Sequence, residues 1–162
     1  MPIRFDETNR VFKLDTKTST YAFLVYQENY LVHLYYGAKI PDTDLKHLMY
    51  RGCFDSLSPY NPKVDDRYFS PDINPMEYPT NGAGDFRISA LSVRGEHGDT
   101  VTDIRYVSHK ITKGKPALQG LPATFAREDE AETLEIEAVD AVTGVKVFLL
   151  YTVSDGLIQL VR

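Results

Sequence analysis

Two runs in the second half of the chain, in which every second residue is apolar, constrain its fold most strongly. Between Leu134 and Ala138, every second residue is apolar and the residues between them are glutamates. After a turn at Thr143-Gly144, every second residue of the run from Val145 to Val153 is apolar and is expected to pack inward, while Phe148 and Leu150 face the other way. A period of two is typical of β-strands with one buried face. We therefore predict neighbouring antiparallel strands here, with the Glu-rich stretch 128–137 on the solvent face.

Short strand-like runs also fill the amino-terminal part of the chain. Ile3–Phe5 and Val11–Leu14 are separated by polar turn-forming residues, which favours a hairpin. The runs 21–26 and 31–36 carry apolar residues on both faces, so we expect them to be buried between layers. Another strand is predicted to begin at Leu157.

The middle of the chain gives two further local predictions. Asp42 is placed to be the N-cap of one short helix that would carry Leu45, Leu48 and Met49. A hairpin is predicted from 88–93 and 101–111, around the turn Gly95-Glu96-His97-Gly98. About eight or nine strands with at most one short helix predict an all-β antiparallel sandwich.

Two irregular segments lie between these strands. Residues 51–76 lack periodicity and are rich in proline and aromatic residues, so we expect a functional loop pinned to its own or a neighbouring domain. The next stretch, 78–87, has Gly82 and Gly84 where a positive φ or close backbone approach would be allowed. Asp85 and Arg87 follow, either as parts of a structural elbow or as polar groups that line a binding surface.

Composition limits the class of protein. The chain has 162 residues, enough for one domain, and a net charge of -5 without any basic cluster, which argues against nucleic acid or a membrane as partner. A single cysteine, Cys53, and the lack of an apolar leader give no sign of secretion, so we expect a cytoplasmic location.

Motifs for catalysis are missing from the sequence. The four histidines have no short-range ligand spacing, and the sequence contains neither a phosphate-binding loop nor a Gly-x-Ser-x-Gly motif. We therefore expect no metal ion, no cofactor and no catalysis by this chain alone.

Four groups of residues occur in a fixed order along the chain: His33-Leu34-Tyr35-Tyr36-Gly37; Glu77-Tyr78-Pro79-Thr80 with Gly84-Asp85-Phe86-Arg87; Thr102-Asp103-Ile104-Arg105-Tyr106 with Ser108-His109; and Lys113-Gly114-Lys115-Pro116 with Gly120-Leu121-Pro122-Ala123-Thr124. Taken in this order, they resemble the amino-terminal domain of bacterial α-galactosidases of glycoside hydrolase family 36. The resemblance spans nearly the whole chain. It implies an antiparallel β-supersandwich of the galactose-mutarotase type, of which residues 1–162 would form the amino-terminal part.

The same resemblance implies what the rest of such an enzyme contains. A catalytic (β/α)8 barrel and a small carboxyl-terminal β domain normally follow, and the barrel carries both carboxylates of a retaining hydrolysis. Neither domain lies within these residues, so the chain alone should be inactive. The implied substrates are terminal α-galactosides such as melibiose or raffinose.

Similar enzymes are often tetramers in which this domain lends a loop to the active site of a neighbouring subunit. By this resemblance, Asp55 would accept hydrogen bonds from sugar hydroxyls, and Arg67 would hold the loop or the sugar. An internal Asp–Arg pair that stiffens the loop is the alternative for Arg67.

Two other functions are compatible with the sequence. A free-standing carbohydrate-binding sandwich would present exposed aromatic platforms, for which Tyr60, Tyr68 and Phe69 are the candidates. A purely structural oligomerisation domain would use the long loop without touching substrate.

Overall fold

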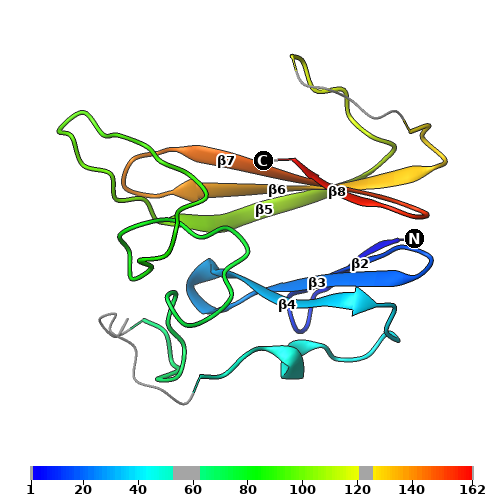
Figure 1. Cartoon of the computed structure of the whole chain (residues 1–162), viewed down its shortest axis with the longest axis horizontal. Coiled ribbons are helices and arrows are strands. Elements are labelled where there is room, and N and C mark those ends of the chain that lie inside the picture. The colour runs from blue at the N-terminus through cyan, green and yellow to red at the C-terminus, as the bar shows by residue number, and fades with distance from the viewer. Residues whose placement is uncertain (1, 53–62, 121–125, 162) are drawn as a thin grey trace.

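Two antiparallel four-stranded sheets form the domain and lie face to face (Figure 1). The computed structural model describes residues 2–52, 63–120 and 126–161. The first sheet has the order β1-β2-β3-β4, and the second β5-β6-β7-β8. Their bounds are β1 Ile3–Asp6, β2 Val11–Asp15, β3 Ser19–Val25, β4 Leu31–Ala38, β5 Ile104–Lys113, β6 Ala131–Asp140, β7 Lys146–Ser154 and β8 Ile158–Val161. The predicted all-β antiparallel sandwich is confirmed.

The first sheet is apolar on both faces, as its sequence predicts. Phe23 and Val25 of β3 pack into the core between the sheets. Their neighbours Ala22 and Leu24 point to the other face and join a second apolar cluster. Successive side chains of a strand point to opposite faces, so β3, an inner strand of this sheet, is covered on both sides.

The second sheet contributes the opposite wall of the core. Leu134 lies opposite Tyr151 in the register of β6 and β7, and Ile136 lies opposite Leu149. All four side chains are at most 1% exposed. Phe148 faces outward and is 45% exposed, so the alternation predicted for β7 is confirmed.

One prediction for the Glu-rich stretch is wrong. Glu135 is exposed as expected, but Glu132 is buried. Its carboxylate accepts a 3.2 Å hydrogen bond from the backbone N–H of Ile3, on the opposite sheet. The physical reason is that side chains two residues apart in a strand lie on the same face, so Glu132 shares the inner face with Leu134.

The predicted helix after Asp42 is also wrong. Only a 3-10 turn, η2, forms at Lys46–Leu48, and Leu45 occupies its N-cap position. The carboxylate of Asp42 instead accepts a 2.7 Å hydrogen bond from Lys13 on β2. Leu45 and Met49 are nevertheless buried, in the second apolar cluster.

The hairpin predicted from 88–93 and 101–111 does not form. Its turn exists, because the N–H of Gly98 donates a 3.0 Å hydrogen bond to the carbonyl of Gly95. However, residues 88–93 are not a strand, and Ile88 is 95% exposed. The partner of β5 is β6.

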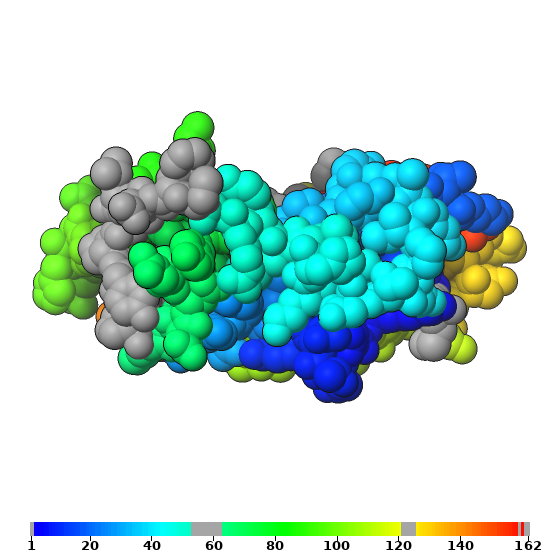
Figure 2. Space-filling view, turned by 90° about the horizontal axis from the view of Figure 1, so that it is seen from below, coloured from blue at the N-terminus to red at the C-terminus, as the bar shows by residue number. Residues whose placement is uncertain are grey.

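The outer face of the first sheet is covered by the segments that follow β4 (Figure 2). Val64 and Phe69 from the long loop pack there against Leu24, Tyr26 and their neighbours. The loop also adds backbone hydrogen bonds along β4, such as the 2.8 Å bond from His33 N–H to the carbonyl of Pro75. The described part of the loop is thus pinned to its own domain.

The corner at 78–87 has the predicted geometry. Gly82 and Gly84 have φ angles of 102° and 94°, which a residue with a Cβ rarely adopts. The buried carboxylate of Asp85 receives hydrogen bonds of 2.9 and 2.8 Å from Nε and Nη2 of Arg87. Arg87 also donates to the carbonyl of Pro71, so this pair forms a structural elbow that supports the loop. Across the described residues, no helix is long and apolar enough to cross a membrane.

Candidate functional site

A tight turn from Asp66 to Phe69 presents Arg67 and Tyr68 to solvent. The N–H of Phe69 donates a 3.1 Å hydrogen bond to the carbonyl of Asp66, and the side chain of Asp66 accepts a 3.0 Å bond from the N–H of Tyr68. Tyr68 is 51% exposed, and the Arg67 guanidinium lies 5.3 Å from the centre of its ring. We call Asp66–Phe69 the Arg67 turn.

Both ends of the Arg67 turn are fixed to Tyr26, which follows β3. The phenol of Tyr26 donates a 2.7 Å hydrogen bond to Oδ2 of Asp66. The ring of Tyr26 packs against Phe69, with 5.0 Å between the ring centres. Tyr26 and Phe69 are both buried, whereas the side chains between the two anchors point outward.

Two neighbours of Tyr26 complete the support. The side-chain oxygen of Gln27 accepts a 2.6 Å hydrogen bond from the N–H of Asp65. The ring of Tyr30 lies 4.9 Å from that of Phe69. Residues 26–30, which include the 3-10 turn η1 at Gln27–Asn29, therefore form one platform under the Arg67 turn, and we call them the 26–30 corner.

Hydrogen bonding keeps the groups at this contact in fixed protonation states. Burial and the bond to Asp66 raise the pKa of Tyr26 to about 12. Burial alone would raise the pKa of the Asp66 carboxyl, but hydrogen bonds from Tyr26, the Tyr68 N–H and Arg51 outweigh it and lower the pKa below its usual 3.8. At neutral pH the contact is therefore a phenol that donates to a carboxylate.

Arg105 of β5, in the second sheet, contacts the 26–30 corner and holds it in place. Its guanidinium lies 3.4 Å from the ring centre of Tyr30 and donates a 2.9 Å hydrogen bond to the carbonyl of Glu28. Asp103 accepts from the same guanidinium, with an Nη2–Oδ2 distance of 2.7 Å. Glu28 and Asn29 have φ angles of 54° and 61°, so the corner needs such external support.

A groove of about 720 Å³ lies beside the Arg67 turn. Its lining includes the side chains of Arg10, Gln27, Lys46, Arg51, Asp65 and Arg67. Guanidinium, ammonium, amide and carboxylate groups can donate and accept hydrogen bonds, as a ligand rich in hydroxyl groups requires.

The predicted site residues have different outcomes. Arg67 is described and exposed on a firmly held turn. Asp55 lies outside the described residues, so its role stays a prediction, and so does the alternative Asp–Arg pair. Of the aromatic platform candidates, Tyr60 lies outside the described residues and Tyr68 is half-exposed. Phe69 is buried as an anchor, so its assignment as a platform is wrong.

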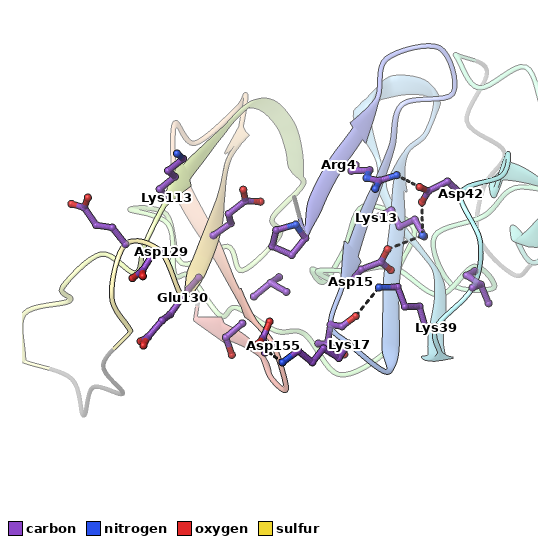
Figure 3. Close-up of a pocket in the computed structure, with 18 of the residues that line it drawn as sticks. Arg4, Lys13, Asp15, Lys17, Lys39, Asp42, Lys113, Asp129, Glu130 and Asp155 are labelled. Carbon is purple, nitrogen blue, oxygen red and sulfur yellow. Dashed lines mark hydrogen bonds and ion pairs between the residues drawn. The ribbon is translucent and has the colours of Figure 1, made fainter.

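A second cleft, of about 730 Å³, lies between the two sheets near their turns (Figure 3). Lys13, which is 8% exposed in its side chain, forms ion pairs there with Asp15 and Asp42 at 2.8 and 2.7 Å. Lys17, in the turn after β2, forms an ion pair at 2.5 Å with Asp155, in the turn after β7, and so joins the two sheets. These charges pair with one another, so we assign no binding role to this cleft.

Comparison with known proteins gives the family. Residues 29–160 match the model described as the glycosyl hydrolase family 36 N-terminal domain. The chain belongs to this family. The resemblance seen in the sequence motifs is therefore confirmed.

Relatives in this family are longer proteins. Over 153 residues, the chain is 41% identical to alpha-galactosidase AgaA of Geobacillus stearothermophilus. The aligned region is 94% of this chain and 21% of that relative. It is also 41% identical over 155 residues to the bifunctional alpha-galactosidase/sucrose kinase AgaSK of Mediterraneibacter gnavus, in a region that is 96% of this chain and 16% of that relative. The chain thus spans about a fifth or less of these proteins.

Solved structures agree with this assignment. The crystal structure of the family 36 alpha-galactosidase AgaB from Geobacillus stearothermophilus superposes with a TM-score of 0.84 at 41% identity, over 96% of this chain and 21% of that one. The galactosidase domain of AgaSK gives a TM-score of 0.85 at 39% identity, over 94% of this chain and 21% of that one. In each case the described fold is one part of a larger enzyme.

Proposed function

We propose that this chain is the amino-terminal accessory domain of a retaining α-galactosidase that hydrolyses terminal α-galactosides of the melibiose and raffinose type. Family membership over residues 29–160 is the observation that carries the proposal. A structure of an AgaA variant in complex with raffinose, 44% identical to this chain with a TM-score of 0.80 over 90% of this chain and 20% of that one, supports the substrate class.

In this proposal, a catalytic (β/α)8 barrel and a carboxyl-terminal β domain follow in the same polypeptide. The barrel supplies the nucleophile and the acid/base, because a retaining hydrolysis needs two carboxyl groups on either side of the glycosidic bond. Residues 1–162 then act in assembly and substrate binding, in a cytoplasmic tetramer.

The Arg67 turn is the part of this domain that we propose to approach the substrate, in the active site of a neighbouring subunit. Three features support it: Arg67 is exposed, the turn beneath it is anchored at both ends, and a groove with polar lining lies beside it. Asp55 would accept hydrogen bonds from the sugar hydroxyls, and Arg67 would donate to the sugar.

The coding frame after Arg162 gives the first test. We expect it to continue into a barrel with a Lys-x-Asp nucleophile strand, and the complete protein to hydrolyse p-nitrophenyl α-galactoside while residues 1–162 alone do not. A stop codon at this point, together with galactose binding by the isolated chain, would instead support a free-standing carbohydrate-binding sandwich.

Kinetics of the complete enzyme test the turn itself. Arg67→Ala should raise KM for raffinose about tenfold, the loss expected for one hydrogen bond from a charged donor. Asp55→Ala should raise KM in the same direction. Arg127→Ala is the matched control, because Arg127 is 80% exposed and, among the described residues, forms an ion pair with nearby Glu130. Sedimentation of the complete enzyme tests the tetramer.

A further inference from the structure

The substrate-facing turn is held by a residue that precedes it by 40 positions in the sequence. We propose that Tyr26 is a positioning residue for substrate binding, which acts by fixing the Arg67 turn in the orientation that the neighbouring active site requires. This inference rests on the proposed function, since it gives Tyr26 a role only if Arg67 meets the substrate.

Tyr26 makes two contacts with the Arg67 turn. Its phenol binds Asp66 at 2.7 Å, and its ring packs on Phe69 at 5.0 Å. Asp66 and Phe69 are the first and fourth residues of the turn and are hydrogen-bonded to each other at 3.1 Å. One buried side chain therefore contacts both ends of the turn, on either side of the two residues that project outward.

The hydroxyl of Tyr26 can be removed without removing every restraint on the turn. Asp66 would still accept hydrogen bonds from Nη1 of Arg51 at 2.7 Å and from the N–H of Tyr68 at 3.0 Å. The ring of phenylalanine would still pack against Phe69. We therefore expect Tyr26→Phe to leave a folded turn whose orientation is less restricted.

A less restricted turn affects binding more than chemistry. Arg67 would have to be ordered when substrate binds, and this ordering reduces affinity without altering the reacting carboxylates. In the complete enzyme, Tyr26→Phe should raise KM for raffinose about fivefold and leave kcat nearly unchanged. Asp66→Asn, which keeps the shape of the side chain but weakens the acceptor, should act in the same direction.

A double-mutant cycle in the complete enzyme tests the route of this effect. KM and kcat are measured for the wild type, Tyr26→Phe, Arg67→Ala and the double variant. Since Tyr26 acts through Arg67, Tyr26→Phe should add nothing to KM once Arg67 is alanine. Tyr35→Phe is the control, because that hydroxyl donates to the carbonyl of Ala38, away from the turn, at 2.9 Å.

The outcomes separate the two proposals. If Arg67→Ala raises KM but Tyr26→Phe does not, the inference about Tyr26 is overturned and the proposed role of Arg67 stands. A rise in KM that is just as large in the Arg67→Ala background would also overturn the inference, because it would show a general structural effect. If Arg67→Ala leaves KM unchanged, the role proposed for the turn fails first, and the inference fails with it.

Discussion

The phenol of Tyr151 donates a 2.6 Å hydrogen bond to the carboxylate of Glu77. Glu77, at the edge of the first sheet, is therefore bonded to a core residue of the second sheet. Tyr21 of β3 donates to the same carboxylate at 2.7 Å. The Glu77 side chain is 2% exposed, and His33 lies 3.5 Å from it. This carboxylate joins both sheets and the end of the long loop at one buried point.

Removal of Glu77 should therefore destabilise the domain. Glu77→Ala would remove a buried carboxylate that accepts from two tyrosine hydroxyls, and we expect the free energy of unfolding to fall by about 3 kcal/mol. Urea denaturation measures this change. Glu137→Ala is the control, since that carboxylate pairs with Lys146 near the surface, and its loss should matter little. Equal stability of Glu77→Ala and wild type would contradict the prediction.

Arg105→Lys should loosen the 26–30 corner. Lysine keeps the charge but cannot stack a planar group on Tyr30 while donating to the carbonyl of Glu28. We expect faster hydrogen exchange of the amides in residues 27–30, measured by mass spectrometry. In the matched variant Arg127→Lys, on an exposed turn, exchange at this corner should stay as in the wild type.

His109 should make stability depend on pH near neutrality. Its ring lies among Phe5 and Phe12, with centres at 4.5 and 4.8 Å, and burial lowers its pKa below the usual 6.5. The unfolded chain then binds a proton more readily than the folded one, so stability is full above pH 6.5 and is lost as the pH falls below it.

Denaturation midpoints between about pH 8 and about pH 5 would measure this slope. His109→Phe should reduce it, because the titrating ring is gone. His97→Gln, at an exposed turn, should keep the slope of the wild type. A slope that is the same in all three proteins would rule out His109 as its source.

Gly82→Ala should strain the corner at 78–87. Gly82 has a φ of 102°, and an added Cβ would lie 2.9 Å from a methyl group of Val101. We expect a loss of about 2 kcal/mol in the free energy of unfolding. Gly156→Ala is a suitable control, since an added Cβ there meets no atom of the described residues within 4 Å. A thermal melt that is unchanged for Gly82→Ala would disprove the strain.

Most strands of this domain could be predicted from the sequence because their pattern is local. Alternation in β6 and β7 identifies which residues face the core, and apolar residues on both sides of β3 predict its two coverings. The errors involve partners that are distant in sequence. Aspartate is a residue type that favours N-cap positions, yet the carboxylate of Asp42 accepts a hydrogen bond from Lys13, which is 29 positions away in the sequence.

The candidate site was predictable only in part, for the same reason. Arg67 could be named from its resemblance to the family, and an aspartate before it is typical of a turn. Nothing in the neighbouring sequence indicates that Tyr26 and Tyr30 hold that turn, or that Arg105 holds Tyr30. Tertiary contacts decide which aromatic residues are platforms and which are anchors, and Phe69 is an anchor.

The sequential strand order of each sheet has a consequence for synthesis on the ribosome. The first sheet is complete at Ala38, before any residue that covers its faces has been translated. A nascent chain at this stage would expose Phe12 and Phe23 on one side and Leu24 on the other, a surface that favours aggregation or chaperone binding. This exposure ends only when residues 40–49 and 63–81, and then β6 and β7, have emerged and can pack.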